Sequence, residues 1–277
     1  MYKQKIGIAV GGNVTDELIK LIKNIGFEAI SFDHGEICNV ERMVNTARRE
    51  GLTVEYLHSD FGGAAKMWSE NEKEAAESVK SLLYDLEVCR KCGIEKMIVH
   101  VWIGFEYTFG ETKYGFENYE KIVNKAKEHG VKICFENTEG QEYLYALMDH
   151  FKNDGTVGFC WDSGHEMCYN YSQDLLKDFG DRLLVTHLND NLGISRFDGV
   201  TYWTDDLHLL PYDGIADWDY NVERLKNSKK LDILNFELGR KSKPNRHEND
   251  AYTKMSDEEY FTEAYKRACK IAYRYSK

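Results

Sequence analysis

The chain has 277 residues, of which 36 are Lys or Arg and 47 are Asp or Glu, so its net charge at neutral pH is −11. An acidic surface of this kind disfavours nucleic acid and anionic membranes as partners, unless a local basic groove exists. The sequence starts without a charged-then-apolar leader and has no apolar run of about 18 residues, which predicts a cytoplasmic protein with no membrane association.

The length and the cysteines indicate one intracellular domain. No linker rich in Gly, Pro or Ser divides the sequence, and a barrel of about 250 residues would account for its length, so we expect residues 1–277 to form a single domain. Two of the seven cysteines, Cys134 and Cys160, fall in apolar stretches, as in proteins of a reducing compartment. The spacing of Cys89 and Cys92 matches a redox or zinc motif, but without a second pair nearby we interpret it as part of a helix.

Apolar stretches alternate with helical patterns along the whole chain. Strands are predicted at 5–10, 29–34, 53–58, 96–101, 132–136, 157–162, 183–187 and 231–237. Helices are predicted at 15–25, 40–50, 71–92, 118–129, 142–152, 173–179, 218–226 and 256–275. Eight strand–helix alternations predict an α/β protein, a single (β/α)8 TIM barrel, with the C-terminal helix packed on its outside.

Four successive predicted strands end in residues that bind metals. These residues are Glu136, Asp162, His187 and Glu237. The carboxyl ends of parallel barrel strands meet at one rim, so the four side chains are expected to converge there. Three carboxylates and one imidazole suit Mn²⁺, Mg²⁺, Co²⁺ or Zn²⁺, whereas a structural zinc site would use more cysteine. The sequence therefore predicts one divalent metal, although a single Glu at a strand end is often only part of an ion pair.

Five further polar residues are candidates for the same rim. His165 follows the sixth strand after a short Ser-Gly turn, and His58 and His100 end the third and fourth strands. Asp206 and His208 lie on one side of an extended segment and are candidates for a second metal or a polar ligand. For each of these residues the alternative is ordinary packing or a solvated loop.

The motifs around these residues resemble a known superfamily. They are Phe-Glu-Asn at 135–137, Trp-Asp-Ser-Gly-His at 161–165, Thr-His-Leu-Asn-Asp at 186–190, Asp-x-His-Leu-x-Pro-x-x-Gly at 206–214 and Phe-Glu-Leu at 236–238. Together they resemble the xylose-isomerase-like TIM barrels, which include sugar phosphate isomerases and epimerases, ketose 3-epimerases, inositol-catabolism enzymes and endonuclease IV. The resemblance covers nearly the whole chain, but it does not specify a substrate.

The ketose 3-epimerase branch implies roles for the matching residues. Glu136, Asp162, His187 and Glu237 would hold the metal, and Glu136 and Glu237 would also be the catalytic acid and base. His165 and Glu142 would contact sugar hydroxyls, and His58, His100, Asp206 and His208 would line the pocket. The branch expects an arginine six residues after His187, where this chain has Gly193. The resemblance leaves a homodimer or homotetramer open.

The endonuclease IV branch offers a competing interpretation. That branch uses nine ligands for three zinc ions, and this chain has all nine: His58, His100, Glu136, Asp162, His165, His187, Asp206, His208 and Glu237. Cleavage of abasic DNA would also need basic and wedge residues, whereas the candidate loops at 60–63 and 204–206 are acidic or neutral. We therefore expect a sugar or polyol isomerase or epimerase, with a zinc phosphodiesterase as the alternative and a sugar-binding barrel without catalysis as a third hypothesis.

Overall fold

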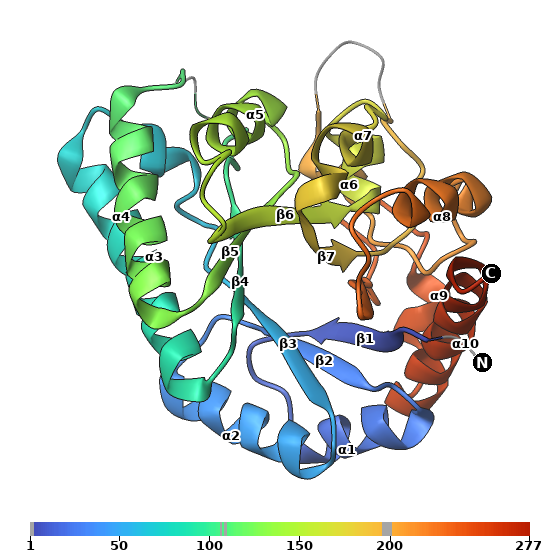
Figure 1. Cartoon of the computed structure of the whole chain (residues 1–277). Helices are drawn as coiled ribbons and strands as arrows, with labels where there is room; N and C mark the ends of the chain where they lie inside the picture. Colours follow the sequence, from blue (N-terminus) through green and yellow to red (C-terminus); the bar gives the residue numbers. More distant parts are fainter. Residues whose placement is uncertain (1–2, 106, 108–109, 196–200) are drawn as a thin grey trace.

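Eight parallel strands form one sheet that curls into a barrel, and the helices lie around its outside (Figure 1). The computed structural model describes residues 3–105, 107, 110–195 and 201–277. The strands are β1 (Lys5–Val10), β2 (Ala29–Asp33), β3 (Thr53–His58), β4 (Lys96–His100), β5 (Lys132–Glu136), β6 (Val157–Asp162), β7 (Leu183–His187) and β8 (Ile233–Phe236). The barrel architecture predicted from the sequence is confirmed.

The sheet runs in the order β7-β6-β5-β4-β3-β2-β1-β8, with parallel pairing between neighbours. The two end strands meet through a single parallel bridge between Leu188 and Phe236, where the Leu188 amide donates to the Asn235 carbonyl at 2.9 Å. The barrel is therefore nearly closed, and every strand delivers its last residue to the same rim.

Side-chain caps mark the starts of several of the helices. The helices are α1 (Asp16–Ile25), α2 (Ile37–Arg49), α3 (Glu72–Cys92), α4 (Lys113–His129), α5 (Gln141–His150), α6 (Ser163–Cys168), α7 (Leu175–Phe179), α8 (Trp218–Lys226), α9 (Asp250–Thr253) and α10 (Asp257–Tyr275). The side chains of Thr15, Asn71 and Ser256 accept backbone N–H groups at the starts of α1, α3 and α10. Helix α10 packs outside the barrel against α1 and α8, and its end lies close to the start of the chain (Figure 1).

Two helices differ from the prediction for local reasons. Helix α4 begins at Lys113, five residues earlier than expected, although Gly115 falls in its first turn. A Cβ at Gly115 would lie 2.1 Å from a Trp68 ring carbon, so the glycine serves close packing here and does not break the helix. Helix α6 was expected to be a turn; it forms because the Asp162 side chain caps it by accepting the His165 amide.

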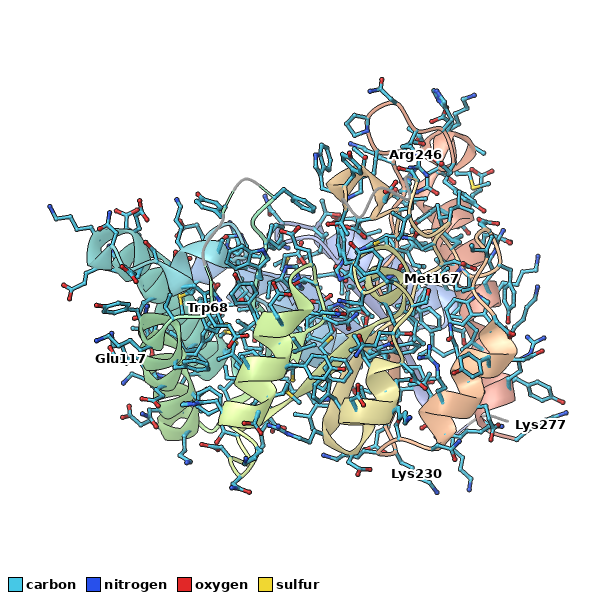
Figure 2. The ribbon with its side chains drawn as sticks, turned by 90° about the horizontal axis from the view of Figure 1, so that it is seen from above. Trp68, Glu117, Met167, Lys230, Arg246 and Lys277 are labelled. Carbon is cyan, nitrogen blue, oxygen red and sulfur yellow. The ribbon has the colours of Figure 1, made fainter. Side chains whose placement is uncertain are left out.

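The barrel interior is layered. At the amino-terminal end of the strands, Lys96 Nζ lies 3.1 Å from Glu55 Oε1, and Asn235 Nδ2 donates to Glu55 Oε2 at 2.9 Å. The next layer is mostly apolar and consists of Tyr56, Ile98, Cys134, Cys160 and Val185. The polar side chains of the rim lie above it. Figure 2 shows the two ends of the barrel, with Lys230 just before β8 at one end and Arg246 after β8 at the other.

Among the helices of the described residues, none is both long and apolar enough to cross a membrane. Cys89 and Cys92 are free and buried on α3, in line with a packing role for that pair.

The interior ion pair generates a stability prediction. Replacing Glu55 with Ala leaves the Lys96 ammonium in a largely buried place without its carboxylate, and breaking such a pair typically costs about 3–5 kcal/mol. We expect urea denaturation of Glu55→Ala to show a loss of free energy of unfolding at the lower end of that range, because Lys96 is partly exposed. The control is Glu95→Ala, which removes an exposed carboxylate at the same end of the barrel. Equal midpoints for the two variants would contradict the prediction.

Candidate metal centre

The ends of β5, β6, β7 and β8 bring four possible metal ligands together. One ligand atom from each of Glu136, Asp162, His187 and Glu237 lies within 4.8 Å of the others. His187 Nδ1 lies 3.0 Å from Glu136 Oε1 and 2.8 Å from Glu237 Oε2. Glu136, Asp162 and His187 are completely buried, whereas Glu237, one residue past β8, keeps partial exposure. The convergence follows from the parallel register, in which Asp162 and His187 are paired residues of β6 and β7.

A second group lies on the β3–β4 side of Glu136. His58, His100 and Glu136 each offer one atom within 4.8 Å of the others. The Glu136 Oε2 atom is 3.0 Å from His100 Nε2 and 3.3 Å from His58 Nε2. The two oxygens of Glu136 therefore face different groups of imidazoles.

A third group lies on the β6 side. Asp162, His165 and His208 form it, again within 4.8 Å. Asp206 is adjacent, with its Oδ1 atom 2.8 Å from His208 Nε2 and 3.4 Å from His165 Nε2. All nine residues that the sequence proposed for one to three metals thus form one continuous cluster.

Two buried acids of this cluster, Glu136 and Asp206, stay ionised because imidazoles surround them, whereas burial raises the pKa of Asp162. Burial alone would raise the pKa of Glu136, but His187 and His100 outweigh burial and hold this pKa well below its usual range. Burial likewise opposes ionisation of Asp206, and His208 is the main partner that holds its pKa well below the ordinary value.

Several of the imidazoles have raised pKa values, whereas burial lowers the pKa of His100. Burial would lower the pKa of His208, but the Asp206 carboxylate raises it to about 9. His165 is also buried, and Asp162 and Asp206 raise its pKa well above the ordinary value. The pKa of His187 is raised against burial in the same way. Without a metal, protons on these histidines balance the charge of the carboxylates.

Side chains that the sequence analysis did not single out hold the cluster in place. Asn137 accepts the Asp162 amide at 2.8 Å and donates to the Asp162 carbonyl at 2.9 Å. Asn189 Nδ2 donates to Asp162 Oδ2 at 2.8 Å, and Asp190 accepts the Trp218 indole N–H at 2.9 Å. Their position one to three residues beyond a strand end was the available signal, but the partners lie on other elements, Asp162 on β6 and Trp218 on α8.

Glu142 does not join the cluster. It lies exposed in the first turn of α5 and is in none of the three groups. The neighbouring Glu139 is the buried carboxylate of this loop, where it accepts the Gly104 amide. A contact between Glu142 and a substrate stays a prediction.

The donor set fits a divalent metal. Carboxylate oxygens and imidazole nitrogens are the ligands that Mn²⁺, Zn²⁺, Co²⁺ and Mg²⁺ take in proteins. The second nitrogens of two of the imidazoles, His100 Nδ1 and His187 Nε2, are buried and have no hydrogen-bond partner within the described residues. The hydrogen-bonding capacity of these two imidazoles is therefore only partly used within the described residues, as expected for ligands of a cation.

A family model described as the xylose isomerase-like TIM barrel matches residues 19–270. The chain belongs to this family. It is 32% identical over 99 residues to an uncharacterised protein of Sinorhizobium fredii, covering 32% of each chain. It is 29% identical over 144 residues to a probable endonuclease 4 of Cenarchaeum symbiosum, covering 44% of this chain and 50% of that protein. These matches span about a third to a half of the curated relatives.

Solved structures share the fold over almost the whole chain. An IolI protein with a bound zinc atom has a TM-score of 0.76 at 18% identity, covering 98% of this chain and 99% of the other. The D-psicose 3-epimerase of Clostridium cellulolyticum H10, solved with D-tagatose, has a TM-score of 0.72 at 12% identity, covering 99% and 100%. At these identities the likeness establishes the barrel and leaves the reaction open.

The raised histidine pKa values predict that metal binding releases protons. A histidine whose pKa lies above the experimental pH holds a proton in the metal-free protein and must lose it to become a ligand. Each proton released makes the affinity about tenfold tighter per pH unit. We expect zinc affinity to rise with pH above neutrality, because His187, whose pKa is raised well above its ordinary value, must lose its proton to bind, and titration calorimetry in buffers of different ionisation enthalpy to detect that released proton.

A His247→Gln variant is the control, because His247 is exposed and pairs only locally with Asp250. Its proton count should equal that of the unchanged protein. A zinc affinity that does not vary with pH would contradict the prediction.

Proposed function

We propose that the protein is a divalent-metal-dependent isomerase or epimerase of a sugar, polyol or sugar phosphate. The observation that carries the proposal is the pair of carboxylates, Glu136 and Glu237, that both approach the Nδ1 atom of His187. Proton transfer at a carbon next to a carbonyl needs one group to remove a proton and a second to return one. Two glutamates beside a shared ligand meet that need when one is ionised and the other carries a proton. Ketose 3-epimerases and the zinc-bound IolI protein, which share this barrel, lend support.

The residues of the cluster would have different roles in the reaction. A bound divalent cation would supply stabilisation of the negative charge that develops as the carbon loses its proton. Of Glu136 and Glu237, the ionised one would accept the proton and the protonated one would return a proton to the carbon, and Asp162 and His187 would complete the ligand set. His165 and His208 would donate hydrogen bonds to substrate oxygens, because their raised pKa values keep them protonated.

The surroundings of the cluster favour a small substrate. A cavity of about 350 Å³ opens beside Glu237 and His208 and is also lined by Asp33 and Arg240. This volume is at the lower end of the range for small-molecule sites, about 300–1,000 Å³. Exposed aromatic rings in the loops beyond the strands include Phe61, Phe105, Tyr107 and Trp203.

The rim offers little to a polyanion. Three basic side chains of the loop after β8 are engaged by acids: Arg240 by Asp257, Lys243 by Asp206 and Arg246 by Asp205. Carboxylates also end or follow the neighbouring strands, at Asp33, Asp60 and Glu139. A DNA backbone would need free cations at these positions.

The acid–base assignment is tested by solvent-proton exchange. With ketoses, inososes and their phosphates as probes in deuterated water, the unchanged protein should introduce deuterium into one substrate. Glu136→Gln and Glu237→Gln should each lower that exchange by about 10²–10⁴-fold, the usual contribution of a positioned acid or base. Far-ultraviolet circular dichroism should show that both variants keep the fold.

The matched control is Glu139→Gln. This buried carboxylate is close in sequence, is in none of the three metal groups, and can still accept the Gly104 amide through its amide oxygen. Full exchange in both Glu136→Gln and Glu237→Gln would reject the assignment.

A second candidate function is hydrolysis of a phosphodiester at an abasic site. It is favoured by the two oxygens of Glu136, which face two different groups as a carboxylate bridging two cations does, and by the third group around His208. Multinuclear sites of this kind support in-line displacement at phosphorus. The partial match to a probable endonuclease 4 adds to it.

Metal content separates the two functions. Under the isomerase proposal, elemental analysis should find one divalent metal that resists dialysis. His187→Ala should abolish its retention, whereas Asp206→Ala should keep it, because Asp206 lies outside the group of four. Three tightly held zinc ions, together with cleavage of an abasic duplex, would instead establish the phosphodiesterase.

A further inference from the structure

The cavity of about 350 Å³ beside the metal centre extends over the end of β1. It is lined by Glu237 and His208 on one side and reaches Leu18 of α1 and Phe261 of α10 on the other. A substrate whose reacting carbon lies next to Glu237 would place one of its ends in this cavity. The side chains that line the cavity therefore determine which chemical group that end carries.

Asp33, the last residue of β2, lines the cavity from the barrel side. One layer below, Asn235 of β8 donates to the Ser31 hydroxyl of β2 at 2.9 Å, across the intervening strand β1. This contact is possible because β1 has Gly7 at that level, where a Cβ would lie 2.9 Å from Asn235 Nδ2. Alternate residues of a strand share a face, so Asp33 lies above Ser31 and Glu237 lies above Asn235. Asp33 and Glu237 therefore face the rim from either side of β1.

The Asp33 carboxylate makes no hydrogen bond and no ion pair with the residues that the structure describes, although it is partly buried. Burial raises its pKa, which the charge of His58 opposes and that of Glu237 increases further. Asp33 is in none of the possible metal groups of the described residues. An acceptor that is withdrawn from water and left unbonded is costly, and a ligand that supplies a donor would offset that cost.

The positive charges of the cavity are already engaged. Arg240 donates through Nε to the Tyr252 carbonyl at 3.1 Å, and through its other nitrogens to Asp257 and to a backbone carbonyl. The Nε2 atom of His208 lies 2.8 Å from Asp206. The residues that line this cavity include no other basic side chain. A phosphate group would therefore meet carboxylates here without a free guanidinium or ammonium group to balance its charge.

We propose that Asp33 is a specificity residue that accepts a hydrogen bond from a terminal hydroxyl of the substrate, so that the end held in this cavity is an unphosphorylated hydroxymethyl group. The inference rests on the proposed isomerase or epimerase function and narrows its substrates to those with a neutral end. A hydroxyl group can donate to a carboxylate, whereas a phosphate would bring about two further negative charges beside it.

The test uses the metal-loaded protein and whichever of D-psicose, D-fructose and D-tagatose exchanges deuterium fastest. Asp33→Ala should raise KM about 10–100-fold, the range for a hydrogen bond to a charged group. It should change kcat little, because the bond is made equally in the ground state and the transition state. Of the 1-deoxy and 6-deoxy forms of the same ketose, one should show no effect of Asp33→Ala, since it lacks the hydroxyl that Asp33 binds.

Phosphate esters of the same ketose test the charge preference. The unchanged protein should use the free ketose better than the ester with phosphate at the position that the deoxy sugars identify. Asp33→Asn keeps an acceptor oxygen and removes the charge, so it should keep a KM for the free ketose close to normal and use the ester better. Its melting temperature should equal or exceed that of the unchanged protein, because an unbonded, partly buried carboxylate does not stabilise the fold.

Glu28→Gln is the control, because Glu28 is exposed and lies directly before β2, at the opposite end of the strand from Asp33. Its KM should be unchanged. An unaltered KM in Asp33→Ala would reject the inference. A rise in KM that is the same for the ketose and both deoxy forms, or a lower melting temperature of Asp33→Asn, would make Asp33 a structural residue.

The phosphate arm separates this inference from the proposed function. Faster exchange by the unchanged protein with the phosphate ester than with the free ketose would reject the neutral end and leave the isomerase or epimerase proposal intact. If no ketose and no phosphate ester exchanges deuterium, the proposed function fails and this inference fails with it.

Discussion

The interaction on which the site depends is the contact between one fully buried carboxylate, Glu136, and the imidazoles around it. An ionised carboxylate removed from water is costly unless opposite charge and hydrogen-bond donors surround it. Here His58 and His100 approach one oxygen, and His165 and His187 approach the other. In the metal-free protein, protons on the histidines supply the opposite charge, and a bound cation would supply it directly. This exchange of protons for a cation underlies both the predicted pH dependence and the proposed chemistry.

The barrel provides the rigidity that such a cluster needs. Cross-strand amides lock Asp162 between β5 and β7, through Asn137 and Asn189. Asp190 holds the segment that carries His208, since both of its carboxylate oxygens accept backbone amides from residues 212 and 216. His208 itself has a φ of 47°, an uncommon conformation for a residue with a side chain. The surrounding hydrogen bonds hold it there, which places the third group against the first two.

Charge and shape around the cluster bear on the choice between a sugar and a nucleic acid. The same nine side chains would serve either a proton-transfer enzyme or a multinuclear hydrolase, so the ligands alone do not discriminate. Three basic side chains of the rim, Arg240, Lys243 and Arg246, are paired with acids, and the adjoining cavity has the size of a small-molecule site. These surroundings support the proposed small-molecule substrate over a nucleic acid.

The sequence by itself determined the barrel and the residues at its rim. Apolar runs that end in Glu136, Asp162 and His187 predict buried parallel strands and their order, since the period of the pattern and the carboxyl-end rule are local properties of the chain. What only the tertiary structure decided is which atoms face which. Register and side-chain packing between strands far apart in sequence decide three features. The two oxygens of Glu136 face two different groups, Glu142 lies outside the cluster, and Cys160 lies beneath His187. The residues in those contacts are separated by irregular intervals along the chain, so no periodic sequence pattern reveals the contacts.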